Sequence, residues 1–281
     1  MTTEIPRFAK VPGGGKLGYS LLGPPDAPPI LLNRPLGGSM ALWGEFACRL
    51  SDELHVIAFD PRGVGASTDV PLGFGTRDMG RDAVALLDHL EVERAHVFGL
   101  SLGGMVASWV AADAPRRVRS LVIGSMITGT TAALRLAVRW SLPVLSALRE
   151  EGGEAEARVI RAVLSPEFRR AHPERERSIE AKVRLFPAKR RNLLALAVAA
   201  ARHSTAPLPL DCTADALLLF GDLDPAAQGK TDEELRKSVP HAIVEHVTDS
   251  GHDLSLEQPV ATAEAILAFV HSLEVRRGAT G

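Results

Sequence analysis

Short apolar runs recur along the chain and alternate with segments whose apolar residues follow a helical period. Six runs have the length of β-strands: PILLN (29–33), HVIAFD (55–60), AHVFG (95–99), RSLVIG (119–124), ALLLFG (216–221) and AIVEHV (242–247). The first five are continuously apolar, which is typical of parallel strands that are buried on both faces of a sheet.

The segments between these runs predict helices. Residues 77–90 place one set of apolar side chains on a single helical face, namely Met79, Ala83, Leu86, Leu87 and Leu90. Residues 103–115 and 259–273 predict two further helices. Strands that alternate with helices favour the α/β class, with a mostly parallel, doubly wound sheet. Ahead of them, GGGKLGYSLLG (13–23) predicts part of an antiparallel hairpin.

This alternation stops between about residues 127 and 210. That segment shows helical patterns broken by glycine and proline, and its Lys and Arg residues outnumber its Glu residues. We predict that residues 1–126 and 211–281 form an α/β core, and that residues 127–210 form a helical cap inserted after the sixth strand.

The composition excludes several classes of protein. With 281 residues, 46% hydrophobic and 23% charged, the chain reads as one or two ordinary globular domains. A net charge of −2 gives no sign of a nucleic-acid or membrane partner. The 2 cysteines form no CxxC motif, the first residues lack a signal-peptide pattern, and no apolar run is long enough to span a membrane. We expect a cytoplasmic protein, with a homodimer as one option for its oligomeric state.

Ser101 lies where a predicted strand turns directly into a predicted helix. Gly99 and Gly103 stand two residues before and after it, so no side chain would clash in a very tight turn. The residue at such an apex has strained backbone angles, and its hydroxyl projects above the sheet beside a helix N-terminus. This pattern predicts a nucleophile elbow; an ordinary glycine-rich turn is the alternative.

A nucleophilic serine needs a base, and His252 is the histidine best placed to be one. It lies in TDSGHDLSLEQP (248–259), between the last predicted strand and the last predicted helix. Loops at the carboxyl ends of parallel strands carry the sites of doubly wound sheets. The other histidines fall in strand, helix or proline-adjacent patterns that are typical of packed or surface residues.

The base in turn needs a carboxylate that orients it. Asp222 and Asp224 both follow the run ALLLFG, and Asp224 lies far enough past the strand to reach His252. Asp222 is predicted to cap the turn through its own backbone. No acid follows the strand that ends at Gly124, and Asp253 is predicted to be a solvated loop residue.

The three residues follow one another in the order serine, aspartate, histidine, and the chain resembles the α/β-hydrolase superfamily over nearly its whole length. FDPRGVGAS (59–67) is similar to the D-x-R-G-x-G-x-S turn of that family, and GHDLSLEQP (251–259) to its G-H-x-x-x-x-E-x-P segment. The helical insertion is similar to the family's cap. Within the superfamily, residues 99–123 most resemble 3-oxoadipate enol-lactonases and related small esterases.

One segment departs from the family's pattern. The family carries His-Gly after its third strand, and the next residue donates an N–H to the oxyanion. Here Arg34 and Pro35 take those two positions. The resemblance then implies that Leu36 supplies one oxyanion amide, and Leu102, the residue after the nucleophile, the other. Arg34 and Trp43 are candidates for substrate contact; for Arg34 a salt bridge within the loop is the alternative.

These features predict a serine hydrolase that cleaves an ester, lactone or related acyl bond of a small molecule, without a cofactor. No His, Cys or Asp cluster has metal-ligand spacing, and DPAAQGKT (224–231) lacks the first glycine of a phosphate-binding loop. The alternatives are a cofactor-free acyltransferase, a C–C hydrolase or a perhydrolase on the same triad. A further alternative is a biosynthetic or ligand-binding member of the fold that does not catalyse hydrolysis.

Overall fold

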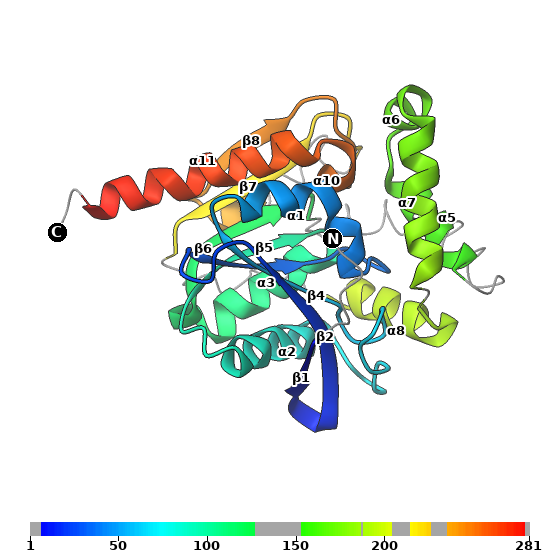
Figure 1. The fold of residues 1–281 in the computed structure, drawn as a ribbon, viewed down its shortest axis with the longest axis horizontal. Helices are drawn as coiled ribbons and strands as arrows, with labels where there is room; N and C mark the ends of the chain where they lie inside the picture. Colours follow the sequence, from blue (N-terminus) through cyan, green and yellow to red (C-terminus); the bar gives the residue numbers. More distant parts are fainter. Residues whose placement is uncertain (1–6, 127–152, 187, 204–213, 226–234, 279–281) are drawn as a thin grey trace.

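The computed structural model describes residues 7–126, 153–186, 188–203, 214–225 and 235–278. Within these ranges an 8-stranded sheet has the order β1-β2-β4-β3-β5-β6-β7-β8 (Figure 1). The strands are β1 (Arg7–Val11), β2 (Gly15–Leu22), β3 (Pro29–Asn33), β4 (His55–Phe59), β5 (Ala95–Leu100), β6 (Val118–Gly124), β7 (Ala216–Gly221) and β8 (Ile243–Val247). β2 pairs antiparallel with β1 and β4, and all other neighbours are parallel. The predicted α/β class, mostly parallel sheet and N-terminal hairpin are confirmed.

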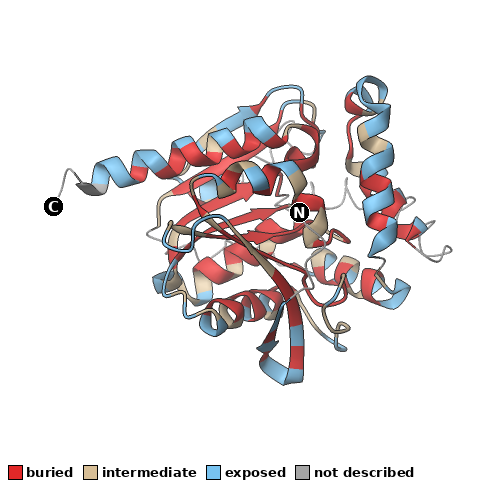
Figure 2. Ribbon diagram, viewed as in Figure 1, coloured by how far each residue is buried: buried red, intermediate tan, exposed pale blue. Residues whose placement is uncertain are grey.

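Helices cover both faces of this sheet (Figure 1). One face packs against α2 (Thr76–His89) and α3 (Leu102–Asp113), and the other against α1 (Gly44–Ser51) and α11 (Pro259–Gly278). Successive residues of β3 point to opposite faces, so Leu31 joins the first cluster while Ile30 and Leu32 join the second. The central strands are therefore buried on both sides (Figure 2), which explains their continuously apolar sequences.

The described residues between β6 and β7 contain helices and no strand. These helices are α5 (Glu154–Val163), α6 (Pro166–Ala171), α7 (Pro173–Leu185) and α8 (Arg190–Ala201). Apolar residues of α5, α6 and α7 pack with Leu42 and with Leu256, which lies on the short helix α10 (Leu254–Glu257). Residues 127–152 and 204–210 of the predicted cap lie outside the described residues, so a separate cap stays a prediction.

None of the helices in the described ranges is both long enough and apolar enough to cross a membrane.

Candidate active site

Ser101 occupies the apex of a sharp turn between β5 and α3. Its φ and ψ are 55° and −115°, a conformation that a residue with a side chain adopts only under strain. A Cβ added to Gly99 would lie 2.0 Å from the carbonyl oxygen of Gly103, and one added to Gly103 would lie 1.9 Å from that of Asn33. The two glycines are therefore required by close backbone approach, as the sequence predicted.

The structure brings the three predicted residues into one hydrogen-bonded row. Nε2 of His252 lies 2.9 Å from Oγ of Ser101, and Nδ1 lies 2.8 Å from Oδ2 of Asp224. The side chains of His252 and Asp224 are 3% and 2% exposed, whereas Ser101 is half-buried. Because the Asp224 carboxylate accepts from Nδ1–H, Nε2 is left to accept the proton of the serine hydroxyl.

The loop after β7 places the two candidate aspartates in different surroundings. Asp224 turns inward, since its backbone N–H donates to the carbonyl of Gly221 at 3.1 Å and its side chain meets His252. Asp222 is exposed, and its Oδ1 accepts from the backbone N–H of Ser250 at 3.2 Å. Asp222 therefore braces the neighbouring loop, and only Asp224 contacts the histidine.

Charges around His252 act on its pKa in opposite directions. Burial lowers the pKa, because it disfavours the imidazolium. The charge and the hydrogen bond of Asp224, together with the charges of Asp253 and Glu257, outweigh burial and raise the pKa of His252 above its usual range. The site therefore stabilises the protonated imidazole that a general base becomes after it accepts a proton.

The two residues predicted to donate to an oxyanion, Leu36 and Leu102, belong to segments that approach each other at the β5–α3 turn. The carbonyl oxygens of Asn33 and Arg34 lie against Gly103, which places the start of the loop after β3 at the N-terminus of α3. Within the described part of the chain, the N–H groups of Leu36 and Leu102 donate to no backbone or side-chain acceptor. Both amides are thus available to a ligand, and their role as an oxyanion hole stays a prediction.

Arg34 and Trp43 lie inside the protein. The Arg34 guanidinium pairs with Asp253, with 3.0 Å between Nη2 and Oδ2, and both side chains are 0% exposed. It also stacks 4.4 Å from the ring centre of Trp43, which packs on Phe46 and Phe98. This is the salt bridge considered as the alternative for Arg34, and substrate contact by either residue stays untested.

The prediction that Asp253 is solvated is wrong. Its carboxylate accepts from Arg34 and from the hydroxyl of Ser255 at 2.6 Å, in the interior. The error arises because Asp253 reads as a loop residue, whereas its partner arginine is 219 positions away in the sequence.

Glu257 is a supporting residue that is not among the residues predicted for the site. Its carboxylate accepts from the backbone N–H of Gly251 at 2.9 Å and from the N–H and hydroxyl of Ser165 on the N-cap of α6. Burial raises the pKa of Glu257, and these hydrogen bonds partly oppose that rise. The signal that could have found it is the glutamate of the G-H-x-x-x-x-E-x-P segment, five residues after His252.

The D-x-R-G turn stabilises the same edge of the sheet. Asp60 accepts from the backbone N–H groups of Met40 and Ala66 at 2.6 and 3.0 Å, and burial raises the pKa of Asp60 to about 6. Arg62 forms a second buried ion pair with Asp82, with 2.6 Å between Nε and Oδ2. These contacts shape the loops, and none of them reaches the Ser101–His252 pair.

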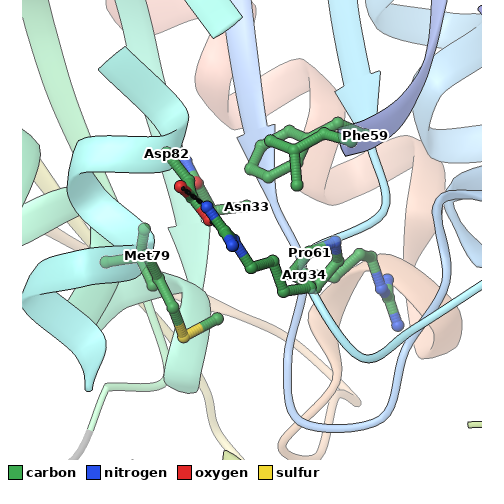
Figure 3. A pocket seen from close by; sticks show the side chains of 9 residues that line it. Asn33, Arg34, Phe59, Pro61, Met79 and Asp82 are labelled. Atoms are coloured by element: carbon green, nitrogen blue, oxygen red, sulfur yellow. Dashed lines mark hydrogen bonds and ion pairs between the residues drawn. The ribbon is translucent and has the colours of Figure 1, made fainter. Parts of the chain in front are cut away.

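A small cavity adjoins this turn, lined by Asn33, Met79 and Asp82 among others (Figure 3). Its volume of about 10 Å³ is close to that of one water-sized probe. Small-molecule sites have volumes of about 300 Å³ or more, so this cavity is too small to hold a substrate of that kind. Among the described residues, no group of His, Cys, Asp and Glu side chains is arranged to hold a metal ion.

Comparison with known proteins places the chain in a family. The sequence profile described as alpha/beta hydrolase fold matches residues 28–259. The chain belongs to this α/β-hydrolase family. It is 26% identical to 3-oxoadipate enol-lactonase 2 of Acinetobacter baylyi, over 90% of this chain and 92% of that protein. The family membership and these named relatives identify the protein as an α/β-hydrolase enzyme.

Two further α/β-hydrolase relatives are informative. A putative carbamate hydrolase, RutD of Variovorax paradoxus, is 42% identical over 109 residues, which is 38% of this chain and 41% of the relative. The crystal structure of the enol-lactonase from Burkholderia xenovorans LB400 superposes with a TM-score of 0.82 at 22% identity, covering 94% of this chain and 100% of that one. At this identity the superposition supports the fold alone.

Proposed function

We propose that this α/β-hydrolase cleaves a small-molecule ester, lactone or related acyl bond through a Ser101–His252–Asp224 triad. The observation that carries the proposal is the unbroken row of hydrogen bonds from the strained Ser101 hydroxyl through the imidazole to a buried carboxylate. A structural serine has no need of a base at hydrogen-bond distance, nor of a carboxylate that orients that base.

In the proposed reaction His252 accepts the Ser101 proton at Nε2 while Oγ attacks the carbonyl carbon of the substrate. The carbonyl oxygen becomes an oxyanion that accepts hydrogen bonds from the amides of Leu36 and Leu102, each worth about 3 kcal/mol. Asp224 holds the imidazole in the tautomer with Nδ1–H and stabilises the imidazolium. Collapse of the intermediate breaks the acyl C–O bond, and the leaving oxygen takes the proton from Nε2.

Water then completes the cycle. It loses a proton to Nε2 of His252 as its oxygen attacks the acyl carbon of the Ser101 ester. The second intermediate collapses, the bond to Oγ breaks, and Oγ recovers the proton from Nε2. One water is consumed, one carboxylic acid is formed, and the enzyme returns to its starting state.

A lactone is the substrate class we favour within this proposal. The relative similar over 90% of the chain is named an enol-lactonase, whereas the carbamate hydrolase is similar over 38%. The residues 127–210 are proposed to form a cap that shapes the acyl pocket. A reducing, cytoplasmic location is also part of the proposal, because the sequence has only 2 cysteines and no CxxC motif.

Hydrolysis of γ-lactones and of p-nitrophenyl esters of increasing acyl length in ¹⁸O-water tests this function. The proposal predicts one solvent oxygen in the carboxylic acid product, and a loss of at least about 10⁴-fold in kcat for Ser101→Ala. Ser272→Ala, at an exposed serine on α11, is the matched control and keeps the full rate. Acid product without solvent ¹⁸O, or acyl transfer to an added alcohol in place of hydrolysis, contradicts the proposal.

A further inference from the structure

The loop after β3 and the loop after β8 are joined by a closed set of buried polar contacts. The Arg34 guanidinium donates from Nη2 to Oδ2 of Asp253 and from Nη1 to the hydroxyl of Ser255, both at 3.0 Å. The Ser255 hydroxyl in turn donates to Oδ1 of Asp253 at 2.6 Å. Three side chains therefore form one ring of hydrogen bonds, and the Arg34 and Asp253 side chains are 0% exposed.

The surroundings pack closely around this ring. Trp43 stacks on the guanidinium at 4.4 Å. A Cβ added to Gly38 would lie 2.7 Å from Nε of Arg34, so the turn accommodates the arginine only because glycine stands there. Two fully buried charges are costly to desolvate, and such pairs are weak sources of stability. Their placement points to a role in positioning.

The two joined loops carry different parts of the proposed catalytic machinery. Leu36, whose amide is a proposed oxyanion donor, comes two residues after Arg34. Asp253 directly follows His252, the proposed base. The hydrogen bonds of the ring therefore connect the loop of the proposed oxyanion donor, Leu36, with the loop of the proposed base, His252. They do so although Arg34 and Asp253 are 219 positions apart in the sequence.

The ring also sets the charge next to the imidazole. In the described part of the chain, the charged groups that act on His252 include Asp224 after β7, and Asp253 and Glu257 at and within α10, and all three are acidic. Arg34 is a buried cation bonded to one of these acids. It compensates Asp253, while Asp224 remains as the hydrogen-bonded partner of the imidazole.

We propose that Arg34 is a positioning residue, which acts through Asp253 to fix the oxyanion loop relative to His252 and to neutralise the carboxylate beside the imidazole. This inference rests on the proposed function. It assigns a purpose to Arg34, which stands where the resemblance to the family places a histidine. It also explains why this arginine is inside the protein, where it is withdrawn from solvent.

The first test measures the pKa of His252 directly, by NMR titration of its imidazole, with His252→Gln as the assignment control. In Arg34→Gln the Asp253 charge loses its counter-ion, so the pKa of His252 rises by about one unit; in Asp253→Asn it falls by a similar amount. The double variant R34Q/D253N returns close to the wild-type value. This titration requires no turnover, so it is independent of the proposed hydrolysis.

The second test separates position from charge. Arg34→Lys keeps the positive charge but loses the planar fork that reaches Asp253 and Ser255 together. We expect its His252 pKa to match the wild type, while kcat for a p-nitrophenyl ester falls at least about tenfold with KM changed less than about twofold. A purely structural role would lower the melting temperature and leave kcat of the folded fraction unchanged.

Asp82→Asn provides the matched control, because Arg62 and Asp82 also form a buried Arg–Asp pair. This pair contacts neither Leu36, the proposed oxyanion donor, nor His252, the proposed base. It should lower the melting temperature and leave the His252 pKa and kcat unchanged. If Arg34→Gln does not fold, Asp253→Asn and Arg34→Lys still give the two expected results. An unchanged His252 pKa in Asp253→Asn together with an unchanged kcat in Arg34→Lys, with Ser101 still reactive, overturns this inference alone. An unreactive Ser101 in the wild type overturns the proposed function.

Discussion

Ser101 combines strained backbone angles with a hydroxyl that reaches the imidazole of His252. Its φ and ψ are 55° and −115°, and its Oγ lies 2.9 Å from Nε2 of His252. A conformation of this kind costs about 1–3 kcal/mol in a residue with a Cβ. In the proposed mechanism this strain is retained because the hydroxyl must face the imidazole of His252 at the carboxyl edge of the sheet.

Replacing Ser101 by glycine should separate stability from activity. These angles are the mirror image of an extended conformation, which glycine adopts freely. We expect Ser101→Gly to raise the free energy of unfolding by about 1 kcal/mol after the entropy cost of glycine is subtracted, while esterase activity is lost. Urea denaturation measures the first quantity. Ser101→Ala should lose activity without that gain, and equal stabilities for the two variants would contradict the strain argument.

The sequence predicted the surroundings of some site residues correctly and those of others incorrectly. Asp224 and His252 were predictable because each follows a strand at its carboxyl end, a position that strand order alone fixes. Asp253 was not, since its burial depends on Arg34, which is distant in sequence and unusual for the family. Contacts of this kind are decided by tertiary packing and leave no local pattern.

The junction between β5 and α3 depends on the close approach of neighbouring backbone segments. Gly99 packs against the carbonyl of Gly103, and Gly103 packs against the carbonyls of Asn33 and Arg34. These carbonyl groups belong to the backbone, so they cannot rotate away as a side chain could. The same two glycines thus let β3, β5 and α3 approach one another and bring the loop after β3 close to Ser101.

Gly103→Ala should therefore be severely destabilising. Its new Cβ would lie 1.9 Å from a carbonyl oxygen, so a strand or the helix must move, and we expect a loss of more than about 3 kcal/mol. Gly75→Ala is the control, because its nearest atom, Oδ2 of Asp78, is 3.8 Å away; it should cost no more than about 1 kcal/mol. Similar unfolding free energies for the two variants would refute this explanation of the turn.

A network of polar side chains joins the segment between β6 and β7 to the α/β core. His203, just past α8, lies with Nδ1 2.9 Å from the hydroxyl of Thr76 on α2. That hydroxyl also accepts from the indole N–H of Trp109 on α3 at 3.1 Å. Burial lowers the pKa of His203 to about 4, so the neutral ring is the form that fits this junction.

Acid should weaken this junction. Unfolded chains bind a proton at His203 below a pH of about 6.5, whereas the folded protein binds it only below about 4. The free energy of unfolding therefore falls as pH is lowered through this window, by up to about 3 kcal/mol from this residue. Urea denaturation between pH 7 and 4 should show a weaker pH dependence for His203→Gln than for wild type. His246→Gln, at an exposed histidine, should retain the wild-type dependence; equal slopes for all three would refute the assignment.

The architecture was predictable from the sequence to a large extent. Continuous apolar runs arise wherever both faces of a strand are covered, and here α2 and α3 cover one face while α1 and α11 cover the other. The helices between β6 and β7 were predicted only as a group. Their apolar residues pack on each other and on Leu42 and Leu256, and such pairings depend on a three-dimensional arrangement that periodicity does not specify.

The central claim is that Ser101 is a nucleophile activated by His252. Treatment with a fluorophosphonate probe, followed by peptide mass spectrometry, tests it most directly. The claim predicts a single phosphonylated peptide modified at Ser101, no labelling of Ser101→Ala, and labelling of His252→Ala slowed by at least about 10³-fold. A wild-type protein that stays unlabelled, or that is labelled equally fast without His252, would contradict it.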